Sequence, residues 1–149
     1  MMNGRRSLLL LTPLLTLALG VALGFYYSQW RITRVTDAAQ FMTAFVAYGE
    51  FLKTQRDQGT ASSYEDALRG RIAFVDRNKD MFTEAFSERV FAIDQALTYA
   101  RLSDLEQKQG AVNEAKRDLD RATSFCPQIG WQNCAGDIIL DFALRADKN

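Results

Sequence analysis

The feature that most constrains this chain is one long stretch without a charged residue near its start. From Ser7 through Trp30 there are 24 uncharged residues, and nine of them are leucine. As a helix this stretch would be about 36 Å long, whereas the hydrocarbon core of a bilayer is about 30 Å thick. Apolar stretches of this length are typical of membrane-spanning helices. We therefore predict a transmembrane helix over residues 7–30, which leaves residues 31–149 to fold as a separate domain.

The residues that flank the predicted span favour one orientation. Its far end carries four aromatic rings, which prefer the headgroup layer of a membrane: Phe25, Tyr26, Tyr27 and Trp30. Arg5, Arg6 and the amino terminus precede the span, and Arg31 and Arg34 follow it. The positive-inside rule then favours residues 1–6 in the cytoplasm and residues 31–149 outside it. We expect a single-pass protein of a bacterial inner membrane with a periplasmic domain.

A cleaved signal peptide is the alternative to a retained span. Ala22, Leu23 and Gly24 offer small residues before a possible cut, although the aromatic rings beyond Gly24 favour retention. If the span is retained, Gly20 and Gly24 have the GxxxG spacing that allows a second transmembrane helix to approach closely. These two glycines are therefore candidates for contact with a partner.

Apolar residues after the span recur at the spacing of a helix. Ala38, Phe41, Phe45, Tyr48 and Leu52 follow a 3-4-3-4 pattern, which predicts a helix from about Val35 to Gln58 with one apolar stripe. This stripe either packs on the chain's own next helices or on another subunit. In the second case Phe41 and Phe45 would contact the partner.

The rest of the chain also has helical patterns. Ser62 and Glu65 have the spacing of a capping box, which predicts that a helix begins there and continues to a polar turn over residues 76–80. A further helix is expected from Phe82 to Gln109. No stretch alternates between apolar and polar residues as a half-buried strand would, so we predict an all-α fold.

The composition excludes several classes of function. With 18 basic and 18 acidic residues the chain is neutral, which argues against a nucleic-acid binder. The chain has no histidine and only two cysteines, so it lacks the usual general base and cannot form a Cys/His zinc site. No nucleophile elbow, phosphate-binding loop or zinc-protease motif occurs. We expect no catalytic residue, no metal and no cofactor, and keep a membrane-bound enzyme as a minor alternative.

The most specific pattern lies in a 34-residue window, residues 96–129. Its signature positions are Tyr99, Leu102, Gly110, Ala115, Leu119, Ala122 and Pro127. In this spacing the window resembles one tetratricopeptide repeat, a helical hairpin of about that length. Two positions depart from the family: Ser103 stands at its small-residue site, and Glu106 stands at its usual tyrosine site.

The resemblance implies a binding surface, and it also implies that other helices bury the apolar faces of the repeat. A single repeat cannot bury its apolar faces, so the preceding helices and a capping helix over about residues 137–148 would have to cover it. In the family the first helix of each repeat forms the concave surface. The corresponding positions here are Leu97, Ala100, Arg101, Asp104, Gln107 and Lys108. A peptide or partner helix would bind there, unless the upstream helices already fill this face.

The two cysteines lie close together in the sequence. Cys126 and Cys134 flank a loop that contains proline and glycine, so in an oxidising compartment a disulfide is the natural interpretation. Free buried thiols are the alternative, and redox chemistry is disfavoured because catalytic dithiols prefer CxxC spacing. Trp131 inside the loop either covers the core or anchors a partner.

Together these patterns predict a membrane-anchored helical interaction protein. It would be a scaffold or accessory subunit of a larger membrane complex, binding other membrane subunits or a peptide segment. The alternatives are a homo-oligomeric membrane scaffold that assembles through Gly20, Gly24 and the Phe41 to Phe45 stripe, and a thiol-redox protein.

Overall fold

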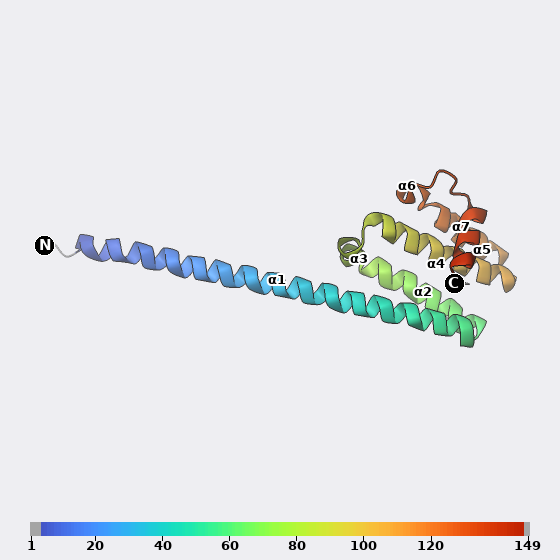
Figure 1. Ribbon diagram of the computed structural model, residues 1–149, viewed down its shortest axis with the longest axis horizontal. Coiled ribbons are helices and arrows are strands. Elements are labelled where there is room, and N and C mark those ends of the chain that lie inside the picture. Colours follow the sequence, from blue (N-terminus) through green and yellow to red (C-terminus); the bar gives the residue numbers. More distant parts are fainter. Residues whose placement is uncertain (1–3, 148–149) are drawn as a thin grey trace. The chain divides into compact units, whose positions relative to one another are not determined.

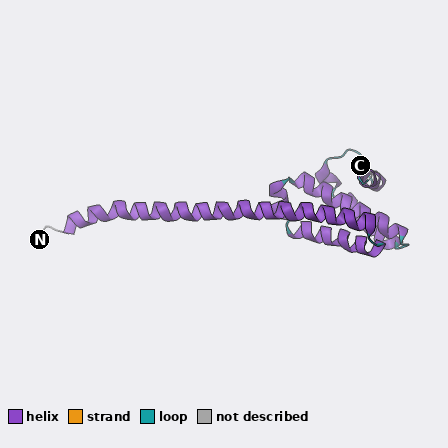
Figure 2. Ribbon diagram, turned by 60° about the horizontal axis from the view of Figure 1, so that its bottom comes forward, coloured by secondary structure: helices purple, strands orange, loops and turns teal. Residues whose placement is uncertain are grey.

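The computed structural model describes residues 4–147, except for the side chains of residues 4–15 and 18. All regular structure in this part of the chain is helical, which confirms the predicted all-α class (Figure 2). The helices are α1 (Gly4–Gln58), α2 (Ala61–Arg77), α3 (Lys79–Ala85), α4 (Glu88–Lys108), α5 (Val112–Thr123), α6 (Cys126–Ile129) and α7 (Gly136–Ala146). The chain divides into two compact units, one ending at Gln40 and the other beginning at Phe41.

The first unit consists of the N-terminal part of α1, which contains the predicted span. Its described apolar side chains, such as Leu23 and Phe25, are exposed, and no atom lies within 4 Å of a side chain built at Gly20 or Gly24. Within the part of the chain that the structure describes, we find no helix that is long and apolar enough to cross a membrane. The side chains of residues 7–15 and 18, which belong to the predicted span, lie outside that part.

The second unit is a set of antiparallel helices. The part of α1 from Phe41 onward lies alongside α2, and α2 packs against α4 (Figure 1). Tyr48 on α1 donates a hydrogen bond to the carbonyl of Ala67 on α2, at 3.2 Å. Gly70 permits this close approach, because a Cβ atom at that position would collide with the Tyr48 hydroxyl.

The beginning of α2 differs from the prediction. Its N-cap is Thr60 and not Ser62, because the Thr60 backbone is extended and its Oγ1 accepts a hydrogen bond from the Ser63 amide at 3.1 Å. Ser62 is already inside the helix. The predicted Ser62 and Glu65 capping box is therefore wrong by two residues.

The predicted helix from Phe82 to Gln109 is interrupted. The short helix α3 ends at Ala85, and Ser87 is the N-cap of α4, since its Oγ accepts a hydrogen bond from the Val90 amide at 3.2 Å. The polar turn predicted over residues 76–80 is also shorter than expected, because only Asn78 separates α2 from α3. Two helices thus replace the predicted one, and they pack at an angle (Figure 1).

An aromatic cluster fills the core between α1, α2, α3 and α4. Phe82 is fully buried at its centre, with ring centroids 6.0 Å from Phe41, 5.1 Å from Phe45 and 5.8 Å from Phe91. Phe41 is only 4% exposed. Of the two alternatives for the apolar stripe of α1, the structure therefore shows packing on the chain's own helices.

Small residues let the C-terminal helices approach α4. Gly110 makes the turn after α4 with a positive φ of 81°, which favours glycine. Ala100, Ala122 and Ala143 come together in a fully buried cluster with Ile129 and Ile139. The helix α7 begins within one residue of the start predicted for the capping helix, about residue 137. The predicted last residue of that helix, Lys148, lies outside the described residues.

The hairpin of α4 and α5 has two helices where the resemblance to a tetratricopeptide repeat implies them. Pro127 is not at the end of α5, which stops at Thr123, but in the first turn of α6. Helical hairpins occur in many all-α folds, so the tetratricopeptide-like unit over residues 96–129 stays a prediction.

Candidate functional site

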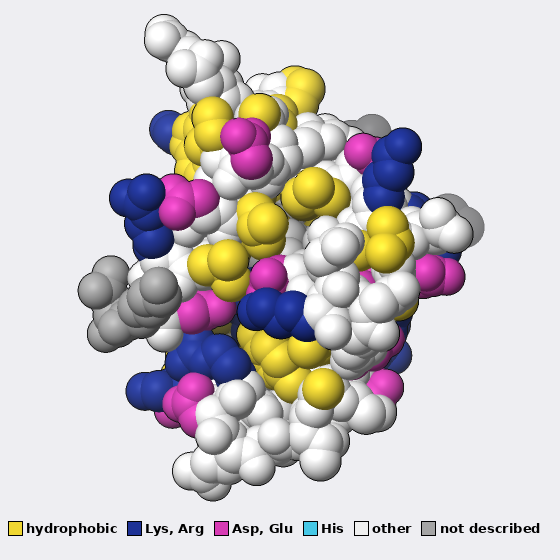
Figure 3. All heavy atoms as spheres, turned by 90° about the vertical axis from the view of Figure 1, so that its right-hand side faces the viewer, with side chains coloured by type: hydrophobic (Ala, Val, Ile, Leu, Met, Phe, Trp, Pro, Cys, Tyr) yellow, Lys and Arg dark blue, Asp and Glu magenta, His cyan; other side chains and the backbone are white. Residues whose placement is uncertain are grey.

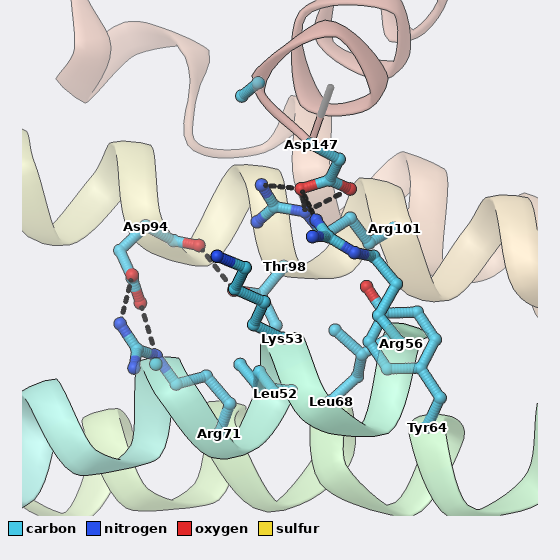
Figure 4. Close-up of a pocket in the computed structure, with 12 residues that line it drawn as sticks. Leu52, Lys53, Arg56, Tyr64, Leu68, Arg71, Asp94, Thr98, Arg101 and Asp147 are labelled. Carbon is cyan, nitrogen blue, oxygen red and sulfur yellow. Dashed lines mark hydrogen bonds and ion pairs between the residues drawn. The ribbon is translucent and has the colours of Figure 1, made fainter. Parts of the chain in front are cut away.

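A groove lies between the last turns of α1, the start of α2, the middle of α4 and the end of α7 (Figure 4). It consists of two adjoining pockets of about 300 Å³ and about 470 Å³, sizes in the range of ligand sites. Arg56, Tyr64, Arg101 and Asp147 line both pockets. We call this feature the arginine groove.

Helical spacing brings the lining side chains to the groove. Lys53 and Arg56 are three residues apart and thus share one face of α1. The same spacing applies on the other two walls. The lining residues of α2 are Tyr64, Leu68 and Arg71, and those of α4 are Asp94, Thr98, Arg101, Asp104, Leu105 and Lys108.

Two arginines hold one carboxylate at the centre of the groove. Arg101 Nε lies 3.1 Å from both carboxylate oxygens of Asp147, and Arg101 Nη2 lies 2.9 Å from Oδ1. Arg56 Nη1 approaches the same Oδ1 at 2.9 Å. The hydrogen bond from Arg56 to Asp57 raises the pKa of Arg56 further above its ordinary value. Arg56 thus contacts two carboxylates, Asp57 and Asp147, whereas Arg101 contacts Asp147 alone.

A buried ion pair closes the other end of the groove. Arg71 Nη2 lies 2.7 Å from Asp94 Oδ1, and Arg71 Nη1 donates to the Phe45 carbonyl at 3.3 Å. The Arg71 guanidinium also stacks 3.9 Å from the Phe45 ring centroid. Only 7% of the Arg71 side chain is exposed, so removal of Asp94 would leave a buried charge without its counterion.

The groove carries an excess of positive charge over an apolar floor. The two pockets together are lined by five basic and three acidic side chains, a surplus of two positive charges that Asp57, paired with Arg56 beside the groove, reduces to one. Lys53 forms no ion pair with any residue that the structure describes. Leu52 and Leu68 form the floor, and burial raises the pKa of Tyr64 at its side, which keeps the hydroxyl protonated. Such a site can bind an anionic group that also has an apolar part.

On one face of the molecule the charges are mixed. On the face drawn in Figure 3, basic and acidic side chains lie next to one another around separate hydrophobic areas. This arrangement is typical of a solvated surface with local ion pairs. The surplus in the groove is therefore a local feature, since the whole chain is neutral.

The predicted partner-binding residues separate into three groups. Arg101, Asp104 and Lys108 line the groove, and Lys108 Nζ lies 2.6 Å from Asp104 Oδ2. Leu97 and Trp131 instead pack against the alanine-rich cluster, so Trp131 covers the core. The other four are Phe41 and Phe45, in the aromatic core, and Gly20 and Gly24, in the first unit.

The sequence did not indicate the other side chains of the groove. Arg56 and Asp147 lie 45 and 46 positions from Arg101, and neither belongs to a local motif. Ionic side chains at helix ends are common on surfaces, so only the fold identifies these two as partners of Arg101. No local motif of the sequence indicated Arg71 either.

A second charged cluster lies where α2, α4 and α5 meet. Arg69 Nη2 lies 2.5 Å from Glu106 Oε1, and Arg69 Nη1 lies 3.9 Å from Asp118 Oδ2. Burial, together with the nearby Asp118 charge, raises the pKa of Glu106. The departure at Glu106 from the repeat pattern thus has a structural explanation, because this side chain pairs with Arg69 across the helix interface.

The cysteines are brought together as the sequence predicts. The sulfur atoms of Cys126 and Cys134 lie 2.09 Å apart, the distance of a disulfide bond. The bond closes the loop that contains α6 and leads into α7. A disulfide is compatible with an oxidising compartment. Among the described residues, no group of three or more acidic or cysteine side chains is placed to hold a metal ion.

Comparison with protein-family models, with curated proteins and with solved structures finds no match to this chain. The function proposed below therefore depends on the chemistry and geometry of this chain's own residues.

Proposed function

We propose that this chain is a membrane-anchored helical interaction protein, a scaffold or accessory subunit of a larger membrane complex. The observation that carries the proposal is the arginine groove, which is open, has surplus positive charge and includes Arg101, Asp104 and Lys108. These residues belong to the helix face that the repeat resemblance implies for binding. In the proposal the hairpin of α4 and α5 acts as a single tetratricopeptide-like unit covered by α2 and α7.

The anchoring part of the proposal is supported by the sequence. The 24 uncharged residues from Ser7 to Trp30 and the arginines before them favour a span with a cytoplasmic N-terminus. The disulfide favours an extracytoplasmic position for the second unit. A bacterial inner membrane with a periplasmic domain satisfies both conditions.

Homo-oligomeric assembly is the second candidate. It is favoured by Gly20 and Gly24, where a Cβ atom built at either position has no atom within 4 Å. The stripe of Phe41 and Phe45 no longer supports it, since these rings pack within the second unit. The partner would then be a second copy of the first unit.

The test is extraction of the tagged full-length protein, at its native level, in a mild detergent. We expect a particle of defined size that contains a second protein in stoichiometric amount. A matched Gly20→Leu/Gly24→Leu variant should keep that partner if the groove makes the contact. A particle that contains this chain alone would contradict the accessory-subunit proposal. If that particle is an oligomer that dissociates in the glycine variant, the result would favour homo-oligomeric assembly.

Anchoring and compartment are tested separately. Alkaline extraction should leave the full-length protein in the membrane fraction, and its release would contradict the anchor. Maleimide labelling without reductant should not modify Cys126 or Cys134 in cells, whereas labelling of both would contradict the extracytoplasmic position.

A further inference from the structure

In the structure, the carboxylate of Asp147 occupies the arginine groove. Arg101 contacts both oxygens of this carboxylate, and Arg56 contacts one of them. A guanidinium that binds two carboxylate oxygens in parallel is a strong and directional arrangement, which a lysine cannot reproduce. The site is thus shaped for a planar carboxylate, and Asp147 shows how such a group fits.

Asp147 is held less firmly than the two arginines that bind it. It follows α7 as its C-cap residue, and Ala146 before it is exposed. The buried residues of α7 are Ile139 and Ala143, so the core anchors this helix one turn or more before Asp147. Helix ends open at a lower free-energy cost than helix interiors. Asp147 can therefore leave the groove without disruption of the core.

Departure of Asp147 would increase the positive charge of the groove by one. Arg101 would then have no carboxylate partner among the described residues, and Arg56 would keep only Asp57. Both arginines lie with Lys53 around the smaller pocket, over the apolar floor of Leu52 and Leu68. A neutral or basic segment would leave these charges unpaired, whereas an acidic one would neutralise them. Charge complementarity thus selects a peptide with carboxylates next to an apolar side chain.

We infer that the arginine groove binds an acidic segment of the partner protein through Arg56 and Arg101, and that Asp147 occupies the same site until that segment displaces it. This inference rests on the proposed interaction function and names the chemistry of the partner. Lys53 pairs with a second carboxylate of the bound segment, and the segment's apolar side chain packs on Leu52 and Leu68.

The inference is tested with the full-length protein in a neutral detergent and a fluorescent peptide, Ala-Leu-Asp-Leu-Asp-Ala. Asp147→Asn removes the competing charge, so it should bind this peptide at least about tenfold more tightly than the wild type. Arg101→Gln should weaken binding at least about tenfold, the size expected for loss of a charge-assisted hydrogen bond. Arg145→Gln is the matched control. It removes one charge from α7 at a 75% exposed side chain and should change the affinity less than about twofold.

Two further measurements separate binding from folding. Arg101→Lys keeps the charge but loses the planar fork, and it should bind more weakly than the wild type while its circular dichroism spectrum is unchanged. A peptide with asparagine in place of both aspartates should not bind any variant. If the acidic peptide fails to bind Asp147→Asn up to about 1 mM, or binds it and Arg101→Gln equally well, the inference is wrong.

Failure of this inference is distinguishable from failure of the proposed function. If a stoichiometric partner is found and remains bound to Arg56→Gln/Arg101→Gln, the interaction function stands and the groove does not bind that partner. If no variant has a partner but the peptide results are as expected, the groove binds carboxylates and the accessory-subunit proposal is wrong.

Discussion

Loss of the disulfide between Cys126 and Cys134 should lower the free energy of unfolding by about 2.5 kcal/mol. The two residues are separated by eight positions, and the chain-entropy model gives a value of this size for so short a closed loop. The bond constrains the connection to α7, whose Ile139 and Ala143 belong to the buried cluster. The effect arises mainly in the unfolded chain, which gains freedom when the loop opens.

The measurement is urea denaturation of the full-length protein in a mild detergent, followed by far-UV circular dichroism with and without reductant. Cys126→Ser/Cys134→Ser should match the reduced wild type and should not respond to reductant. A decrease of less than about 0.5 kcal/mol in both samples would refute the reasoning. A decrease confined to the reductant-treated wild type would show that the serine hydroxyls compensate by new contacts.

Three other changes test the core, a buried carboxyl and a helix cap. Phe82→Ala should cost about 3 to 5 kcal/mol in chemical denaturation because Phe82 is fully buried, and the partly exposed Phe86→Ala should cost clearly less; equal losses would contradict the assignment of the core. The raised pKa of Glu106 means that the folded state binds its proton more tightly, so stability falls as the pH rises above the ordinary value of 4.5. Glu106→Gln should therefore gain stability relative to the wild type between pH 4 and pH 7, and a difference that is constant with pH would contradict this. Ser87→Ala should cost about 0.5 to 2 kcal/mol of unfolding free energy through loss of the α4 cap, whereas no change would mean that the Ser87 hydroxyl is dispensable.

The fold class and the main turns were predictable from local patterns. Apolar periodicity identified the helical regions, and Gly110 marked the turn between α4 and α5, where a positive φ favours glycine. The cysteine spacing predicted a pairing that the structure has. These features depend on residues close together in the sequence.

Two helix boundaries were not predictable in the same way. Near the start of α2, Thr60, Ser62 and Ser63 are all capable N-cap residues, and the extended backbone at Thr60 decides between them. At Ser87 the apolar spacing continues from α3 into α4, so periodicity alone gives one helix. The hydrogen bond from the Val90 amide to the Ser87 hydroxyl favours a new helix start there.

The candidate site was predictable on one wall only. The register of α4 identified Arg101, Asp104 and Lys108, because these positions follow from helical spacing and the repeat resemblance. The opposite wall requires contacts between residues more than 40 positions apart, such as that between Arg101 and Asp147. No local pattern encodes such contacts, so Arg56 and Asp147 became visible only in the fold.

The helix α7 connects the disulfide loop with the arginine groove, which no local sequence pattern links. Its start is reached through the loop closed by Cys126 and Cys134, and its end places Asp147 between Arg56 and Arg101. The disulfide therefore restricts the helix that carries the internal ligand of the groove. Because a restricted helix loses less entropy when Asp147 binds, the bond would strengthen the competition with the acidic partner that we propose. In an oxidising compartment the arginine groove would thus select a partner whose carboxylates bind Arg56 and Arg101 more tightly than Asp147 does.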